Sequence, residues 1–219
     1  MRESLSLGNS LRRWRVGFGR GEELKFLSHL DLMRLWERLL RRGGVPLAYS
    51  QGFTPHPQLS LALPLPLGVT SQAELLDLWL ARPLPLGHLL SALERQCPRG
   101  VALGGAEPVP PRAPTHPTQV RAAEYRVEGE GNGVAEAVAA LMSASHFPWE
   151  HRRDKEVRRY DLRPLVEGLR AERGPRGEWV LEMRLKAGPE ATGRPDQVAL
   201  AVGLQPHRLH RTRILLEVP

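Results

Sequence analysis

The sequence predicts an α+β protein made of two halves, each with the same order of strands and helices. Two observations support this fold class. Segments of alternating apolar and polar residues, as in half-buried strands, are interspersed with segments whose apolar residues recur every three or four positions, as in amphipathic helices. Five prolines between Pro108 and Pro117 then separate two long stretches. With 219 residues, 41% of them hydrophobic, the chain can bury a core in both.

The first half is expected to follow the order β-α-β-β-α-β. Trp14, Val16 and Phe18 alternate with polar or small residues, which predicts a first strand over 12–20. Ser28 is a typical N-cap for a helix that continues to 42, where two glycines end it. The later elements are expected as extended segments at 45–50 and 59–63, a strand at 73–81, a helix at 86–96 and a strand at 101–109.

The second half follows a similar order. Its clearest strand is 178–186, where Trp179, Leu181 and Met183 face one way. Asp161 is expected to cap a short helix over 162–170. The other expected elements are a strand at 124–128, a helix at 134–145, an extended segment at 149–160, a helix from 195 to 202 and a strand at 210–218.

Both orders are those of a ferredoxin-like unit, which is an antiparallel sheet with helices packed on one face. The sequence therefore predicts a tandem pair of ferredoxin-like halves. The N-terminal half is expected over 1–107, a proline-rich linker over 108–120 and the C-terminal half over 121–219.

The charge of the chain favours an anionic partner such as RNA. It carries 31 Lys and Arg against 24 Asp and Glu, a net charge of +7, and only three of the basic residues are lysine. Arginine binds phosphate in a fork and stacks on bases, but a GC-rich genome also produces arginine in excess. Genome composition accounts for the ratio of arginine to lysine and leaves the net charge and its clustering unexplained.

Cysteine usage and hydrophobicity exclude several classes of function. Cys97 is the only cysteine, so the chain alone cannot form an intrachain disulfide or a thiolate-ligated iron–sulfur cluster. No histidine or carboxylate shows a recognised metal-ligand spacing, so we expect no metal site and no cofactor. No apolar run is long enough to span a membrane and the N-terminus has no signal-peptide core, so we expect a cytoplasmic protein.

The most informative stretch is 28–68, in which an arginine-rich helix leads into an unusual loop. The helix carries an arginine ridge, which either binds phosphate or forms a solvated, partner-facing surface: Arg34, Arg38, Arg41 and Arg42. The loop combines aromatic rings, a hydroxyl, an amide and an imidazole, and its candidate ligand-binding residues are Tyr49, Ser50, Gln51, Phe53 and His56.

We expect the loop to return along the helix to its N-terminal end. This would bring His56 within reach of Ser28, His29 and Asp31. Free N–H groups and partial positive charge at a helix N-terminus favour anions, so the sequence predicts one anion-binding site there.

Other basic clusters interleave arginine with aromatic residues, as proteins that bind single-stranded nucleic acid do. Their candidate RNA-binding residues are Arg158, Arg159, Arg211 and Arg213.

Several of these motifs occur together in one family. The run SHLDLMR at 28–34, YSQGFTPHP at 49–57 and PLPLG at 64–68, with shorter matches at 161–164 and 211–213, resembles the radical-SAM-linked proteins that carry the domain of unknown function 2344. The resemblance implies that the protein works beside a radical-SAM enzyme, whose cluster would belong to that partner. It implies no settled activity.

The expected function is that of a non-catalytic RNA-binding or substrate-presenting accessory protein that acts with a radical-SAM protein. Two alternatives remain open. One is a metal-independent endoribonuclease of the tandem ferredoxin-like type, in which His29 or His56, with Tyr49 and Lys25, supplies acid, base and charge stabilisation. The other is a protein–protein adaptor whose basic face docks on an acidic partner.

Overall fold

The computed structural model describes residues 12–110, 113–153, 156–188 and 190–217. The elements of the first half are β1 (Arg12–Arg20), a 3-10 turn (Glu22–Leu24), α1 (His29–Arg42), β2 (Leu59–Leu61), β3 (Val69–Leu80), α2 (Leu86–Gln96) and β4 (Val101–Val109). The elements of the second half are α3 (His116–Gln119), β5 (Val120–Glu130), α4 (Val134–Ser143), β6 (Pro148–Arg153), β7 (Glu156–Asp161), a 3-10 turn (Arg163–Leu165), β8 (Val166–Arg173), β9 (Trp179–Lys186), α5 (Pro195–Ala201) and β10 (Gln205–Leu216).

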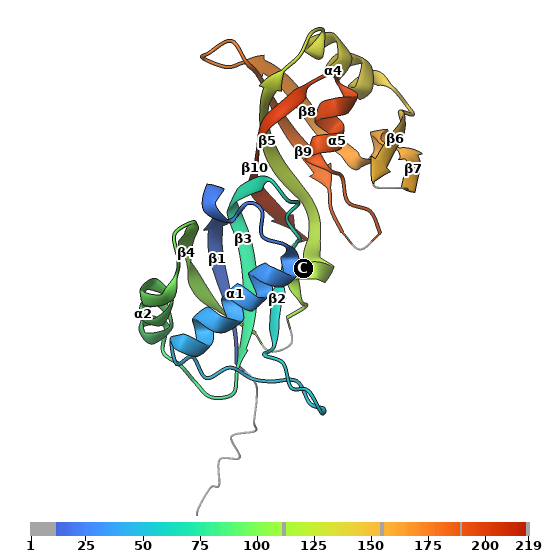
Figure 1. The fold of residues 1–219 in the computed structure, drawn as a ribbon. Helices are drawn as coiled ribbons and strands as arrows, with labels where there is room; N and C mark the ends of the chain where they lie inside the picture. The colour runs from blue at the N-terminus through green and yellow to red at the C-terminus, as the bar shows by residue number, and fades with distance from the viewer. Residues whose placement is uncertain (1–11, 111–112, 154–155, 189, 218–219) are drawn as a thin grey trace, which may run out of the picture.

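A single sheet continues through both halves of the molecule (Figure 1). Its strand order is β4-β1-β3-β10-β5-β9-β8, and β2 also pairs with β3. All described pairings are antiparallel except the one that joins the halves, where Leu209, His210 and Arg211 of β10 run parallel to the start of β3. The protein is therefore a mixed α/β fold with a mostly antiparallel sheet.

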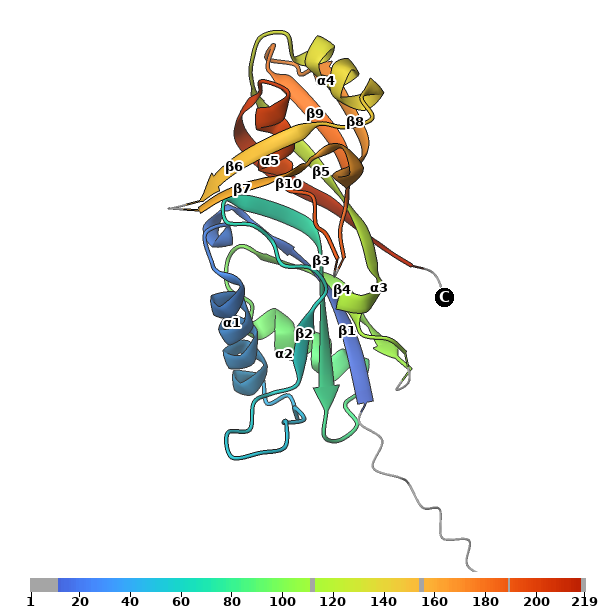
Figure 2. The ribbon, with the colours of Figure 1, turned by 90° about the vertical axis from the view of Figure 1, so that its right-hand side faces the viewer.

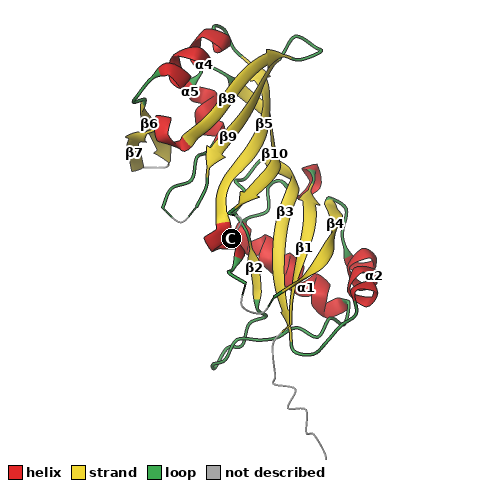
Figure 3. Ribbon diagram, turned by 180° about the vertical axis from the view of Figure 1, so that it is seen from behind, coloured by secondary structure: helices red, strands yellow, loops and turns green. Residues whose placement is uncertain are grey.

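The helices cover one face of this sheet and leave the other face open. Figure 1 shows α1 and α5 in front of the strands, and the opposite view in Figure 3 shows the strands in front of both helices. In the first half the covered face is closed by Trp36 of α1, which is fully buried and meets the ring of Phe18 edge-on, with 4.8 Å between ring centroids.

The first half forms as its sequence pattern predicts. The strand at 12–20, the helix at 86–96 and the strand at 101–109 have the expected bounds. Ser28 caps α1, because its hydroxyl oxygen accepts a hydrogen bond from the Asp31 N–H at 3.1 Å. The third strand starts at Val69, four residues earlier than predicted, because its first residues pair with β10 of the other half.

The predicted helix over 162–170 is wrong. Asp161 precedes a 3-10 turn whose N-cap is Leu162, and its carboxylate accepts hydrogen bonds from the N–H groups of Phe147 and Arg163. The chain then leaves the turn as strand β8, in which Val166 and Leu169 are buried and pair with β9. A single 3-10 turn offers few internal hydrogen bonds, so pairing with the neighbouring strand outweighs local helix propensity.

The predicted linker over 108–120 is also more structured than expected. The segment contains the end of β4, the short helix α3 and the start of β5, while 111–112 lie outside the described residues. The guanidinium of buried Arg13 donates hydrogen bonds to the carbonyls of Ala113 and Pro114, at 2.7 and 2.9 Å, and pairs with Asp77. Part of the segment is thus fastened to the first half.

Candidate nucleic-acid interface

The arginine ridge lies on the outer face of α1. The opposite face of this helix packs into the core through Leu32, Trp36, Leu39 and Leu40. Because helical residues three or four positions apart share a face, this packing turns all four predicted arginines outward, and all four are exposed: Arg34, Arg38, Arg41 and Arg42.

Half of the ridge is compensated by carboxylates. Arg34 lies 3.3 Å from Asp31, and Arg41 lies 3.3 Å from Glu37, both as exposed pairs that contribute a few tenths of a kcal/mol. In the part of the chain that the structure describes, Arg38 and Arg42 have no ion-pair partner. These two cations remain available to an anionic ligand.

The loop after α1 is a narrow hairpin. Tyr49 forms a β-bridge with Pro57, the Ser50 N–H donates to the His56 carbonyl at 2.8 Å, and the His56 N–H donates to the Ser50 hydroxyl at 3.0 Å. Gly52, with a φ of 130°, lets the chain turn at the tip. The next residue, Phe53, is fully exposed. The loop therefore presents its side chains to solvent.

The prediction that this loop lies beside the N-terminus of α1 is wrong. The chain that enters α1 is held at the start of β3, where the Gly68 N–H donates to the Lys25 carbonyl. The loop is held at the other end of β3, where the Ala48 N–H donates to the Trp79 carbonyl. The eight residue steps from Ser71 to Trp79 of β3 span about 26 Å of strand. The chain pairs with β3 as soon as α1 ends, so it never travels back along the helix.

This placement separates the residues of the expected single site. Lys25 and His29 lie near the start of β3, whereas Tyr49 and His56 belong to the loop held at the other end of β3. Lys25 pairs with Glu22 at 2.7 Å. The four residues that an endoribonuclease would combine as acid, base and cation are thus not brought together.

No acidic residue occurs in α1 after Glu37, in this loop or in the turn after β3, and exposed residues of these three segments are here grouped as the basic end. Arg82 was not predicted from the sequence. The Ala81 N–H donates a hydrogen bond to the Pro46 carbonyl, which holds the neighbouring Arg82 beside the start of the loop. No Asp or Glu occurs between Glu37 and Glu74, or between Asp77 and Glu94. This lack of acidic residues around Arg82 is the sequence signal that could have identified it as a candidate. The basic end consists of Arg38, Arg41, Arg42, Tyr49, Phe53, His56 and Arg82, all exposed.

Arg211 is not a surface residue, which corrects its prediction as an RNA contact. Its side chain is fully buried where the two halves meet. Its guanidinium donates to Glu74 at 2.8 Å, to the carbonyls of Leu63 and Pro64 at 3.1 and 2.9 Å, and to the Tyr125 hydroxyl. With its donors used inside the protein, Arg211 ties the halves together.

The remaining predicted arginines are exposed but lie elsewhere. Arg213 is on β10, and Arg158 and Arg159 are on the hairpin of β6 and β7, in pairs with Glu156 and Glu150. Figure 2 shows that hairpin on the same side of the molecule as α1, above the first half. These three arginines therefore lie on other elements than the residues of the basic end.

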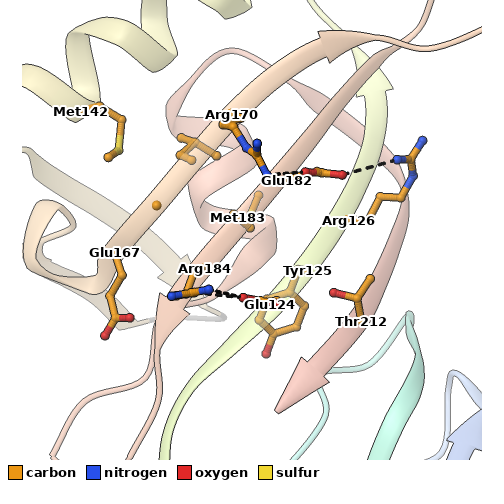
Figure 4. A pocket seen from close by; sticks show the side chains of 12 residues that line it. Glu124, Tyr125, Arg126, Met142, Glu167, Arg170, Glu182, Met183, Arg184 and Thr212 are labelled. Carbon is orange, nitrogen blue, oxygen red and sulfur yellow. Dashed lines mark hydrogen bonds and ion pairs between the residues drawn. The ribbon is translucent and has the colours of Figure 1, made fainter. Parts of the chain in front are cut away.

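A charged cavity on the open face is electrically balanced (Figure 4). It has a volume of about 590 Å³ and lies over β5, β8 and β9. Arg184 donates to Glu124 at 2.6 Å, and Arg170 donates to Glu182 at 3.0 Å. Since each cation there has a carboxylate beside it, this surface offers little net attraction to phosphate.

Nucleophilic and metal chemistry find no assembled centre in the described residues. Burial raises the pKa of the Cys97 thiol to about 11, so the reactive thiolate is scarce at neutral pH. Within 12–110, 113–153, 156–188 and 190–217, no three His, Cys, Asp or Glu side chains cluster as a metal site. No described helix is both long and apolar enough to cross a membrane.

Comparison with known proteins places the chain in a family. No curated protein matches it. A chain from a crystal structure of a Cbf5-Nop10-Gar1 complex matches with a TM-score of 0.44 and 10% identity, covering 90% of this chain and 48% of the other, so the protein spans about half of that chain. The family model described as uncharacterized protein conserved in bacteria matches residues 13–195. Because this match covers most of the sequence, the protein belongs to the DUF2344 family.

Proposed function

We propose that the protein binds RNA through the basic end and acts as a non-catalytic accessory or substrate-presenting protein. The observation that carries this proposal is the combination of unpaired Arg38 and Arg42 with the fully exposed ring of Phe53, on a surface poor in carboxylates. Single-stranded nucleic acid is bound in this way, because cations contact the phosphates while bases stack on aromatic rings.

The proposal also covers the type of fold, two ferredoxin-like units, and the partner, a radical-SAM protein. Strand orders β4-β1-β3-β2 and β10-β5-β9-β8 are those of two ferredoxin-like units, with the β6–β7 hairpin as an insertion in the second. The radical-SAM partner rests on the motif resemblance alone. Neither the fold nor the resemblance indicates a ligand, so RNA is proposed from the distribution of charged and aromatic residues.

The test is fluorescence polarisation with a labelled single-stranded RNA of mixed sequence. We expect wild-type binding to weaken steeply with salt, because phosphate contacts release counterions. The double variant Arg38→Glu plus Arg42→Glu should bind at least about tenfold more weakly and show a shallower salt dependence, since each lost phosphate contact removes about 0.7 from the slope. Its melting temperature should stay close to that of the wild type, because both residues are exposed.

A matched control reverses the same charge elsewhere. Arg95, in the last turn of α2, and Arg99, just after it, are both exposed. Arg95→Glu plus Arg99→Glu changes the net charge by the same amount as Arg38→Glu plus Arg42→Glu. We expect this control to bind nearly as well as the wild type. Equal weakening in both double variants would show a general effect of charge, and absence of RNA binding at low ionic strength would refute the proposal.

A protein–protein adaptor is the second candidate. Phe26, Leu30 and Leu67 are large apolar residues with more than half of their surface exposed near the N-terminal end of α1. Clustered exposed apolar residues often mark docking sites. Co-purification from native cells with Leu30→Glu as the comparison variant tests this candidate: loss of a specific protein partner with retained RNA binding would favour it.

A further inference from the structure

A second cavity lies where the two halves join, on the open face of the sheet. This junction pocket has a volume of about 470 Å³ and is bounded by β1, β3, β4 and β10. Val16 and Phe18 point into the core, so Gly17 and Gly19, which alternate with them, face the opposite, open side. The residues of the pocket used below are Gly19, Gly104, Thr70, Gln72, Arg208 and His210, with Ala102 beside Gly19.

The floor of the junction pocket is bare backbone. Glycines occur where β1 and β4 meet, including Gly19, which pairs with Ala102, and Gly104. A Cβ added to Gly19 would lie 3.1 Å from the Ser71 carbonyl oxygen and 3.3 Å from the Ala102 Cβ, closer than ordinary contact. A side chain at position 19 would crowd these neighbours, so glycine fits there best and the backbone of β1 itself lines the pocket.

One wall of the pocket holds a histidine in a defined orientation. The Thr70 hydroxyl lies 2.8 Å from His210 Nδ1. On the other side of the ring, Nε2 lies 3.2 Å from the side-chain carbonyl oxygen of Gln72, which can only accept, so in the neutral ring Nε2 carries the proton and Nδ1 accepts from the Thr70 hydroxyl. Burial, reinforced by the charge of Arg208, lowers the pKa of His210 and favours this neutral form. The wall thus offers a polar edge to a ligand.

The other wall carries a positive charge, the guanidinium of Arg208, which can change its orientation. Arg208 is 57% exposed, and its nearest carboxylate, Glu128, lies 3.7 Å away. This is too long for a strong charge-assisted hydrogen bond, so the guanidinium can turn toward a phosphate. Glu22, at the edge of the pocket, already pairs with Lys25 at 2.7 Å.

We propose that the junction pocket binds a single nucleotide, with its base on the glycine floor and its phosphate against Arg208. Gln72 and His210 would contact the edge of the base. The cavity falls within the usual size range of small-molecule sites. The nucleotide can come from a free nucleoside monophosphate or from an RNA strand bound to the protein. The first source is independent of the proposed function and the second rests on it.

The experiment titrates the full chain with adenosine, guanosine, cytidine and uridine 5′-monophosphates by calorimetry and ligand-observed NMR. Ala102→Phe fills the pocket from an exposed position, and Arg208→Ala removes its cation. Arg213→Ala, an exposed arginine on the same strand but outside the pocket, is the matched control. We expect at least one monophosphate to bind, about tenfold weaker binding in Arg208→Ala, loss in Ala102→Phe and no change in the control.

RNA affinity of the same variants separates the two sources. Weaker RNA binding in Ala102→Phe and Arg208→Ala, without monophosphate binding to the wild type, supports a nucleotide of an RNA strand. Arg38→Glu plus Arg42→Glu should leave monophosphate binding unchanged. Loss of RNA binding at the basic end can therefore be distinguished from loss of nucleotide binding in the pocket. Monophosphate binding that none of the pocket variants alters, or no monophosphate binding together with unchanged RNA affinity, would overturn the proposal.

Discussion

At the scale of single residues, arginine performs two opposite tasks in this protein. Arg20 is buried, and its guanidinium donates to the carbonyls of Leu24, Lys25 and Leu27 at 2.9, 2.8 and 2.7 Å. Arg38 is exposed and makes no ion pair with any described residue. Five donors in a rigid fork suit arginine both to binding several carbonyls inside the protein and to contacting phosphate outside it.

Loss of the buried guanidinium at the junction should be costly. Arg211→Ala leaves the Glu74 carboxylate buried without its partner, so we expect the free energy of unfolding to fall by about 3–5 kcal/mol. Urea unfolding followed by circular dichroism measures this. The exposed neighbour provides the control, because Arg213→Ala should change stability by less than about 0.5 kcal/mol. A loss below about 1 kcal/mol in Arg211→Ala would contradict the assigned role.

His210 should make stability depend on pH. Burial and Arg208 lower its pKa in the folded protein, with opposing contributions from Glu128 and Glu22, while the unfolded chain keeps a value near 6.5. The folded state therefore binds fewer protons, and this contribution to stability is complete above about pH 7 and declines as the pH falls below about 6.5. His210→Gln should remove that decline. A stability difference between wild type and variant that stays constant from about pH 7.5 to 5 would contradict this.

At the scale of elements, the proposed interface combines α1 with the hairpin that follows it. The helix carries the arginines, and the Tyr49–Pro57 bridge closes the hairpin whose tip carries the ring of Phe53. Hydrogen bonds between Ser50 and His56 in both directions hold the hairpin closed. The exposed ring of Phe53 therefore stabilises nothing within the described structure and is free for a ligand.

Removal of that ring should affect binding and not folding. Phe53→Ala should leave the free energy of unfolding within about 0.5 kcal/mol of the wild type, because the side chain is fully exposed. RNA affinity should fall by about 1–3 kcal/mol, the usual contribution of one base stacked on an aromatic ring. Polarisation titrations measure the loss, with Leu67→Ala as an exposed apolar control. Unchanged affinity would remove Phe53 from the interface.

At the scale of the whole molecule, the two halves share a sheet and a buried ion pair. The parallel ladder between β3 and β10 joins them, and Arg211 of the second half binds Glu74 of the first. These contacts do not depend on the covalent connection between the halves, so the halves should stay together when that connection is cut.

A break in the connecting segment should leave one particle. We expect a protein with a specific protease site inserted between residues 111 and 112 to elute at the same volume in gel filtration before and after cleavage, because the shared sheet persists. Denaturant should then release two fragments of roughly equal size. Separation of the fragments under native conditions would show that the 1–107 and 121–219 halves are independent domains.

Local pattern was sufficient for most elements of the fold. Alternation in β1, the Ser28 cap of α1 and the periodicity of α2 involve residues close in sequence, so their structure follows from local sterics and amphipathicity. The exposure of the arginine ridge could be predicted for the same reason, since one apolar face determines which side of a helix is buried.

Contacts between distant residues decided the rest. Pairing with β9 turned 166–173 into a strand, and pairing with the far end of β3 kept the loop of His56 away from His29. Arg211 and Arg213 lie two positions apart in the sequence, yet one is buried against Glu74 and the other is exposed. By itself the sequence determined the element types, the net charge and the amphipathic faces, which depend on near neighbours. Only the tertiary structure decided which distant residues met, because such contacts depend on the path of the whole chain, as for Glu74 and Arg211, which lie 137 positions apart.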